Sequence, residues 1–151
     1  MTETVSFERS HSIDIKAPAS TVLNYVSNPN SWCEWLAATH DINSDDRPLI
    51  TGDTFSEKWV TRTGEVTLNW VVTDHKENSF WIGETGTDFI GTIIVRYDVT
   101  QDWEQTSFKR TMINPARKKA PTREMIIRMD EEANIALLNI KKIVEQRHQN
   151  I

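Results

Sequence analysis

Several charged side chains in this sequence alternate with large apolar ones. Glu57 lies two residues from both Phe55 and Trp59, and Arg110 has the same relation to Phe108. Residues two apart share one face of a strand, so these charges are predicted to point toward the same interior as the aromatic rings. Burying an unpaired charge costs free energy. Each charge must therefore pair with another group, with water or with a ligand, or lie at the open rim.

These residue types could support binding or proton transfer. An inward Arg110 needs an acceptor, and we expect Glu57 to supply it, which would leave guanidinium donors for a ligand carbonyl or carboxylate. General acid–base chemistry needs a donor and an acceptor within hydrogen-bond reach of a substrate. The candidates are His11 with Glu57 or Tyr97. For each residue alone, a structural role at the rim is the alternative.

Motifs for metal or nucleotide chemistry do not occur. Cys33 is the single cysteine, and the four histidines, His11, His40, His75 and His148, lack metal-ligand spacing. The five glycines are scattered and form no phosphate-binding loop, and no Gly-x-Ser-x-Gly sequence occurs. We therefore expect no metal and no cofactor.

Length and charge narrow the class of protein. A chain of 151 residues fits one domain over 1–151. Its 22 acidic residues outnumber 17 lysines and arginines, and the net charge of −5 disfavours nucleic-acid binding. No apolar tract reaches the roughly 18 residues of a membrane span. The N-terminal stretch lacks the apolar region of a signal peptide, so a cytoplasmic location is expected.

The hydrophobic pattern predicts which elements hold these residues. Alternation over 5–16 predicts a half-buried strand, and a short helix should follow over 17–28. A second short helical piece, over 28–36, would place Trp32 and Trp35 on one inward side.

In the rest of the chain, the spacing of apolar residues changes once, from the alternation of strands to the spacing of a helix. Alternation broken by turn signals predicts five or six antiparallel strands from about Thr39 onward. One of these strands, around 79–85, is ambiguous, because either Phe80 with Ile82 or Trp81 could face inward. Apolar residues at intervals of three and four then predict one long amphipathic helix from Thr122 to about Gln149.

The segments "IDIKAPASTVLNYVSNPNSWCEW", "PLITGDTF" and "YDVTQDWEQTSF" resemble the START-related, or SRPBCC, superfamily, which includes birch-pollen allergens, START domains and bacterial polyketide cyclase/dehydrase and lipid transport proteins. The resemblance implies an α+β helix-grip fold. Such a fold has a curved antiparallel sheet of six or seven strands around a long C-terminal helix. Two short helices after the first strand plug one end, so Trp32 and Trp35 would either cap a cavity or serve as core anchors.

Two main functions follow from this resemblance. The first is binding of a hydrophobic or amphipathic small molecule between sheet and helix, with Trp59, Trp70 and Phe108 as walls and Arg110 or Glu57 fixing its orientation.

The alternative is a polyketide cyclase/aromatase-like enzyme that uses His11, Glu57 or Tyr97 in the same cavity. A protein-interaction domain that uses the exposed face of the sheet is a third class. A monomer or a homodimer would be compatible with all three.

A basic segment, Arg117 to Arg123, precedes the long helix. It is either a solvated loop or, since the family places this loop beside the cavity entrance, a contact for an anionic ligand headgroup.

Overall fold

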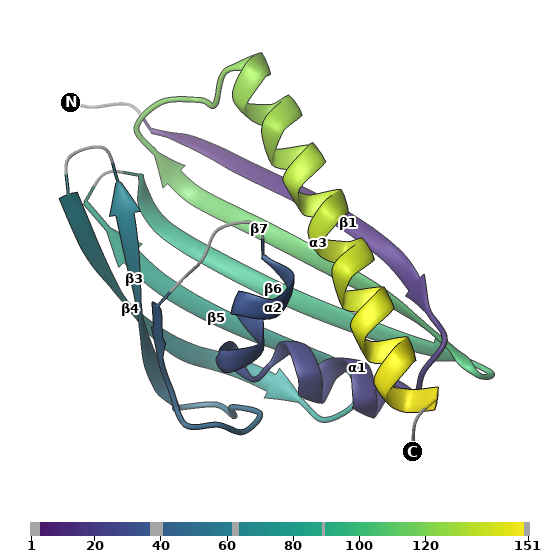
Figure 1. Cartoon of the computed structure of the whole chain (residues 1–151). Coiled ribbons are helices and arrows are strands. Elements are labelled where there is room, and N and C mark those ends of the chain that lie inside the picture. The colour runs from purple at the N-terminus through teal and green to yellow at the C-terminus, as the bar shows by residue number, and fades with distance from the viewer. Residues whose placement is uncertain (1–3, 37–40, 62–63, 89, 150–151) are drawn as a thin grey trace.

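The computed structural model describes residues 4–36, 41–61, 64–88 and 90–149. Its elements, in chain order, are β1 (Val5–Ile15), α1 (Ala19–Val26), the 3-10 helix η1 (Pro29–Ser31), α2 (Trp32–Trp35), β2 (Asp41–Asn43), β3 (Thr54–Thr61), β4 (Gly64–Lys76), β5 (Phe80–Thr87), β6 (Gly91–Asp102), β7 (Gln105–Arg117) and α3 (Arg123–Gln149). Figure 1 shows the sheet behind α3, with α1 and α2 near its lower part.

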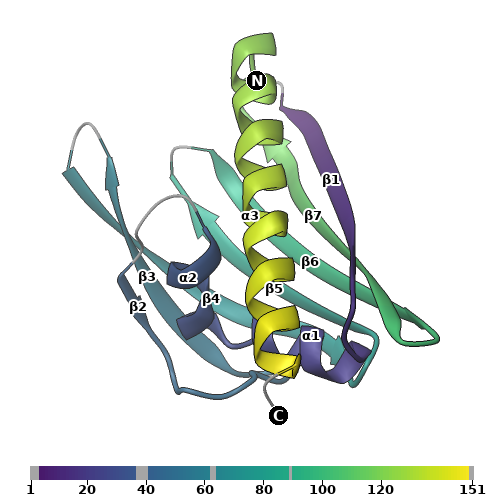
Figure 2. The same cartoon turned by 45° about the vertical axis from the view of Figure 1, so that its right-hand side comes forward.

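The strands form one antiparallel sheet of seven strands in the order β1-β7-β6-β5-β4-β3-β2. Each strand from β2 to β6 pairs with the next in the chain, whereas β1 adds to the far edge beside β7. The sheet curves around α3, and α1 and α2 lie on the same side of the sheet as α3 (Figure 2). The predicted helix-grip fold is confirmed.

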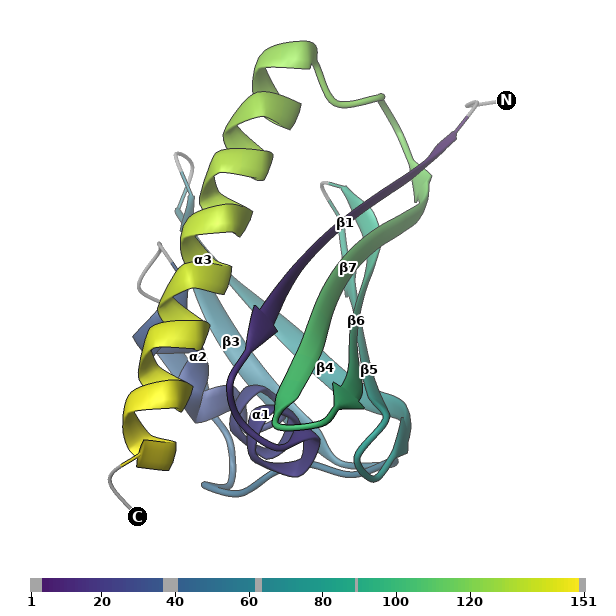
Figure 3. The same ribbon diagram turned by 90° about the vertical axis from the view of Figure 1, so that its right-hand side faces the viewer.

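The long helix α3 packs unevenly along its length. Its fully buried side chains begin at Ala133 and continue to Val144, whereas Ile126 and Met129 on the same predicted face are only half-buried. Figure 3 shows the C-terminal half close to α1 and the N-terminal half diverging from the strands. The apolar stripe of the helix is therefore split between a packed C-terminal half and an N-terminal half whose apolar side chains are only partly buried.

Aromatic residues fill the packed end. The Trp32 ring lies edge-on to Phe55 and Trp70, with centroids 5.4 and 5.7 Å away. Trp35 is fully buried, and its indole N–H donates to Ser31 Oγ at 3.1 Å. Buried indole groups need such partners. Trp32 and Trp35 thus anchor the core, and Trp32 also borders the cavity described below.

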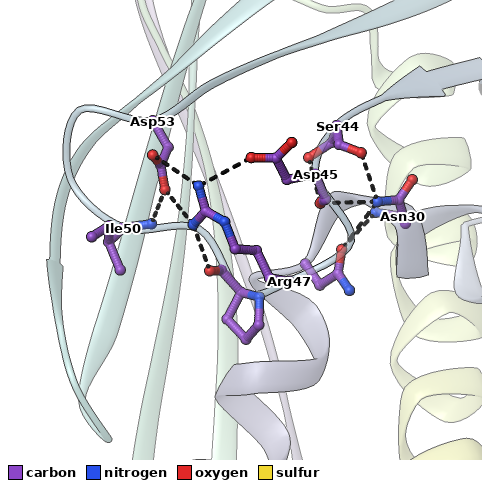
Figure 4. A network of polar contacts seen from close by, with 8 residues as sticks. Asn30, Ser44, Asp45, Arg47, Ile50 and Asp53 are labelled. Atoms are coloured by element: carbon purple, nitrogen blue, oxygen red, sulfur yellow. Dashed lines mark hydrogen bonds and ion pairs between the residues drawn. The ribbon is translucent and has the colours of Figure 1, made fainter.

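A polar network holds the loop between β2 and β3 (Figure 4). Arg47 Nη1 donates to Asp53 Oδ2 at 2.8 Å, and the backbone N–H of Ile50 donates to the same oxygen at 2.8 Å. The Arg47 hydrogen bond is the main cause that lowers the pKa of Asp53. Asn30 Nδ2 donates to the backbone oxygen of Asp45 at 3.1 Å, which ties this loop to η1.

Candidate ligand cavity

A cavity of about 360 Å³ lies between the sheet and the N-terminal half of α3. It is within the range of small-molecule sites, near the lower limit. Its lining is mostly apolar, with a few polar groups, and comprises Trp32, Leu36, Glu57, Trp59, Trp70, Ile90, Ile93, Val95, Tyr97, Arg110, Met112, Asn114, Arg117, Met125 and Met129.

Strand β7 supplies most of the polar lining. Arg110, Met112 and Asn114 lie at intervals of two and therefore share one face. The pairing with β1 then shifts, because Val5 is opposite Arg117 while Phe7 is opposite Asn114. One extra residue on β7 forms a bulge, which turns Arg117 to the cavity as well.

Glu57 is buried in the cavity wall. Its side chain is 2% exposed, and Oε1 accepts a hydrogen bond from Trp70 Nε1 at 3.1 Å. The predicted pair with Arg110 does not occur among the ion pairs of the described residues. Glu57 and Arg110 lie on β3 and β7, which are four strands apart in the sheet. Three strands, β4, β5 and β6, therefore lie between them in the sheet.

Tyr97 lies directly opposite Arg110 on the neighbouring strand β6. Burial is the main cause that raises the pKa of Tyr97. The charge of Arg110 and a hydrogen bond with Arg110 lower this pKa, whereas the negative charge of Glu57 raises it further. The net pKa is above the ordinary value. The hydroxyl therefore stays protonated at neutral pH and can serve as a hydrogen-bond donor.

Two buried polar atoms of the lining have no hydrogen-bond partner: Arg110 Nε and Asn114 Oδ1. The Arg110 guanidinium also lies over the Trp35 ring, 5.9 Å from its centroid. Unsatisfied buried groups of this kind are rare in folded proteins and cost about 1–3 kcal/mol each. The cavity therefore offers one free donor and one free acceptor on the same strand.

Five residues predicted for the site line the cavity: Glu57, Trp59, Trp70, Tyr97 and Arg110. Asn114 was not predicted. The signal was present in the sequence, since Asn114 is the next inward position after Arg110 and Met112.

His11 and Phe108 fall outside the lining. His11 Nε2 donates to Asp130 Oδ1 on α3 at 2.7 Å, and Arg9 Nε donates to the same oxygen at 2.8 Å. Hydrogen bonds from Arg9 and then His11 lower the pKa of Asp130. Phe108 is fully buried and packs against Tyr97, with centroids 5.7 Å apart. Both residues thus have structural contacts where a ligand contact was predicted.

The basic segment is divided between the cavity and the surface. Arg117 lines the cavity and donates from Nε to the backbone oxygen of Lys119 at 2.8 Å. Lys118, Lys119 and Arg123 are exposed. Arg117 is therefore the member of this segment that can meet a ligand in the cavity.

A larger hollow, of about 970 Å³, lies beside the turn between β6 and β7. Its residues include Asp102, Trp103, Glu104 and Gln105, all of which are exposed. This hollow is a depression of the surface and lacks the buried walls of a ligand site.

The comparisons with known proteins agree with this geometry. A family model described as polyketide cyclase / dehydrase and lipid transport matches residues 5–145. The chain belongs to this family. The match confirms the resemblance to the START-related superfamily. A search of curated proteins found no match in sequence.

Three solved structures show how widely the fold is shared. The Zhui aromatase/cyclase from Streptomyces sp. R1128 has a TM-score of 0.69 and 13% identity over 95% of this chain and 96% of that chain. Ara h 8.0201 has a TM-score of 0.67 and 9% identity over 93% of this chain and 98% of that chain. The Aha1 dimer from Colwellia psychrerythraea has a TM-score of 0.66 and 17% identity over 92% of this chain and 96% of that chain. These likenesses establish the fold.

In the described part of the chain, which leaves out His40, no three His, Cys, Asp or Glu side chains are placed to hold a metal ion. No helix in the described ranges is long and apolar enough to cross a membrane.

Proposed function

We propose that this protein binds a small hydrophobic or amphipathic molecule in the cavity between the sheet and α3. The observation that carries the proposal is the pair of buried atoms without partners, Arg110 Nε and Asn114 Oδ1, in an otherwise apolar space. A bound molecule would recover the free energy that these groups lose on burial.

The volume limits the size of the ligand. At about 30 Å³ per water molecule, the cavity holds about a dozen water-sized groups. This suits a compound of one or two rings or a short chain. Trp59 and Trp70 offer flat walls for such a body.

Titration with the neutral dye N-phenylnaphthylamine tests the proposal. We expect saturable binding to the wild type. Met129→Trp fills the opening beside α3 and should abolish binding, whereas Leu138→Trp, on an exposed part of the same helix, should not. Equal binding by both variants would show that the dye binds elsewhere and would refute the proposal.

A cyclase-like reaction in the same cavity is a second candidate. It is supported by the fold shared with an aromatase/cyclase and by the presence of Glu57 and Tyr97 in one lining. Tyr97 would donate a proton or hydrogen bond to a carbonyl, and Glu57 would accept a proton. The absence of His11 from the lining removes one predicted acid–base group, so binding is favoured. Turnover of a poly-carbonyl precursor that Tyr97→Phe abolishes would reverse this preference.

We propose that 1–151 acts as one domain in a reducing, cytoplasmic compartment, because Cys33 is a free and exposed thiol. We propose a monomer or a homodimer as the oligomeric state.

A further inference from the structure

We propose that the ligand is a small organic acid whose apolar body carries a hydrogen-bond donor, such as a hydroxyl, and that Asn114 Oδ1 accepts a hydrogen bond from this donor. This inference rests on the proposed binding function and specifies its ligand class. It assigns different parts of the ligand to Asn114 and to the two arginines of the lining.

The orientation of the Asn114 amide is fixed by a neighbour that can only accept. Asn114 Nδ2 donates to the backbone oxygen of Thr92 at 3.2 Å, and a carbonyl oxygen cannot donate to an amide oxygen in return. The amide nitrogen must therefore face Thr92. This leaves Oδ1 as an acceptor without a partner, on a side chain that is 0% exposed and lines the cavity.

The free donor of Arg110 does not satisfy the free acceptor of Asn114, although both are on β7. They are four residues apart on an extended strand, which separates their Cα atoms by about 14 Å. Both groups remain unsatisfied. A ligand that lies along β7 can present an acceptor to Arg110 and a donor to Asn114, which an apolar ligand cannot do.

The charged side chains of the cavity lining favour an acidic ligand. The lining contains two arginines, Arg110 and Arg117, and one carboxylate, Glu57, which accepts from Trp70. Within the described ranges, no ion pair involves Arg110 or Arg117. An anionic ligand would find cations that no protein carboxylate occupies, while a cationic ligand would be repelled.

Rigid naphthalene probes can measure separately how much the acid group and the hydrogen-bond donor of a ligand contribute to its affinity. The set consists of naphthoic acid, isomers of hydroxynaphthoic acid with the hydroxyl on the ring remote from the carboxylate, the matching methoxynaphthoic acids, and naphthol. We expect at least one hydroxy isomer to bind the wild type about fivefold more tightly than naphthoic acid, as one net hydrogen bond provides. Its methoxy counterpart, which cannot donate, should show no gain.

Asn114→Leu should remove the preference for the hydroxy isomer. Arg117→Leu should weaken the binding of the acids and leave the binding of naphthol unchanged. Asn69→Leu, the same change at an exposed position of β4, is the control and should leave the preference intact. Because the methoxy comparison is made within the wild type, the preference for a ligand with a donor is tested even if Asn114→Leu folds poorly, and Asn114→Asp then tests the residue itself, since its carboxylate should repel the acids.

The outcomes distinguish this inference from the binding function. If the probes bind but no hydroxy isomer exceeds naphthoic acid, the role of Asn114 is refuted and the binding function stands. If naphthol binds as tightly as the acids, the acid class is refuted. If none of these probes binds although N-phenylnaphthylamine does, the proposed ligand class is refuted and the binding function stands; if N-phenylnaphthylamine does not bind either, both proposals fail.

Discussion

His11 on β1 and Asp130 on α3 are 119 positions apart in sequence, yet His11 Nε2 lies 2.7 Å from Asp130 Oδ1. Arg9 reaches the same carboxylate. Because hydrogen bonds from both residues lower the pKa of Asp130, the carboxylate stays ionised and both partners must act as donors. This contact fastens the N-terminal half of α3 to the edge of the sheet.

The Asp130 contact predicts a pH dependence of stability. A lowered pKa in the folded state means that the contact stabilises the protein above the unfolded pKa of about 3.9 and is lost as pH falls through the lower, folded value. Asp130→Asn should therefore lower the urea midpoint at pH 7, and the difference from wild type should shrink below about pH 4. A constant difference across this range would contradict the assignment.

Leu137→Asp should unfold the protein. Leu137 is 1% exposed on the packed half of α3, and an unpaired carboxylate there should cost about 4 kcal/mol or more. Leu138 is 58% exposed, so Leu138→Asp is the matched control and should change stability by less than about 0.5 kcal/mol. Thermal unfolding by circular dichroism measures both. A cooperative transition near the wild-type temperature for Leu137→Asp would show that the buried face is misassigned.

Arg110→Met should weaken acidic ligands selectively. Loss of the guanidinium leaves a ligand carboxylate without its partner, which costs about 1–3 kcal/mol, while the apolar walls are unchanged. Anilinonaphthalene sulfonate and neutral N-phenylnaphthylamine are matched probes for fluorescence titration. Equal loss for both dyes, or no loss for either, would remove Arg110 from the site.

Gly83→Ala should destabilise β5. A Cβ at Gly83 would lie 2.8 Å from Cη2 of Trp81, a ring that is 1% exposed and cannot move freely. Overpacking of this kind costs about 1–3 kcal/mol. Gly86 on the same strand has no atom within 4 Å of such a Cβ, so Gly86→Ala is the control. Similar urea midpoints for both variants would contradict the tight contact.

Hydrophobic periodicity was sufficient to predict the elements of the fold, because each pattern reports which face of a strand or helix is buried. The long helix and the alternating strands have this local origin. Periodicity could not decide whether Phe80 or Trp81 faces inward, since both are aromatic. The structure buries Trp81, and Gly83 on the same face makes room for its ring.

The site was predicted less completely, because alternation gives the face of a residue but not its neighbours in space. His11 lies on an edge strand that contacts α3, so its inward side meets Asp130 rather than the cavity. Glu57 and Arg110 share the concave face but belong to strands that are far apart in the sheet. The bulge that turns Arg117 inward depends on the pairing with β1, and its local signal, Pro115, marks an irregularity without telling which later residue faces inward.

Along α3, the uneven packing separates the residues that pack into the core from those that border the cavity. The buried side chains of the helix are Ala133, Ala136, Leu137, Ile140 and Val144, whereas the exposed Met125 and the half-buried Met129 border the cavity. Substitutions of Met125 or Met129 thus remove few core contacts and should cost little stability. Such an arrangement lets ligand preference diverge between related proteins by exchange of a few lining side chains, while the same scaffold is inherited unchanged.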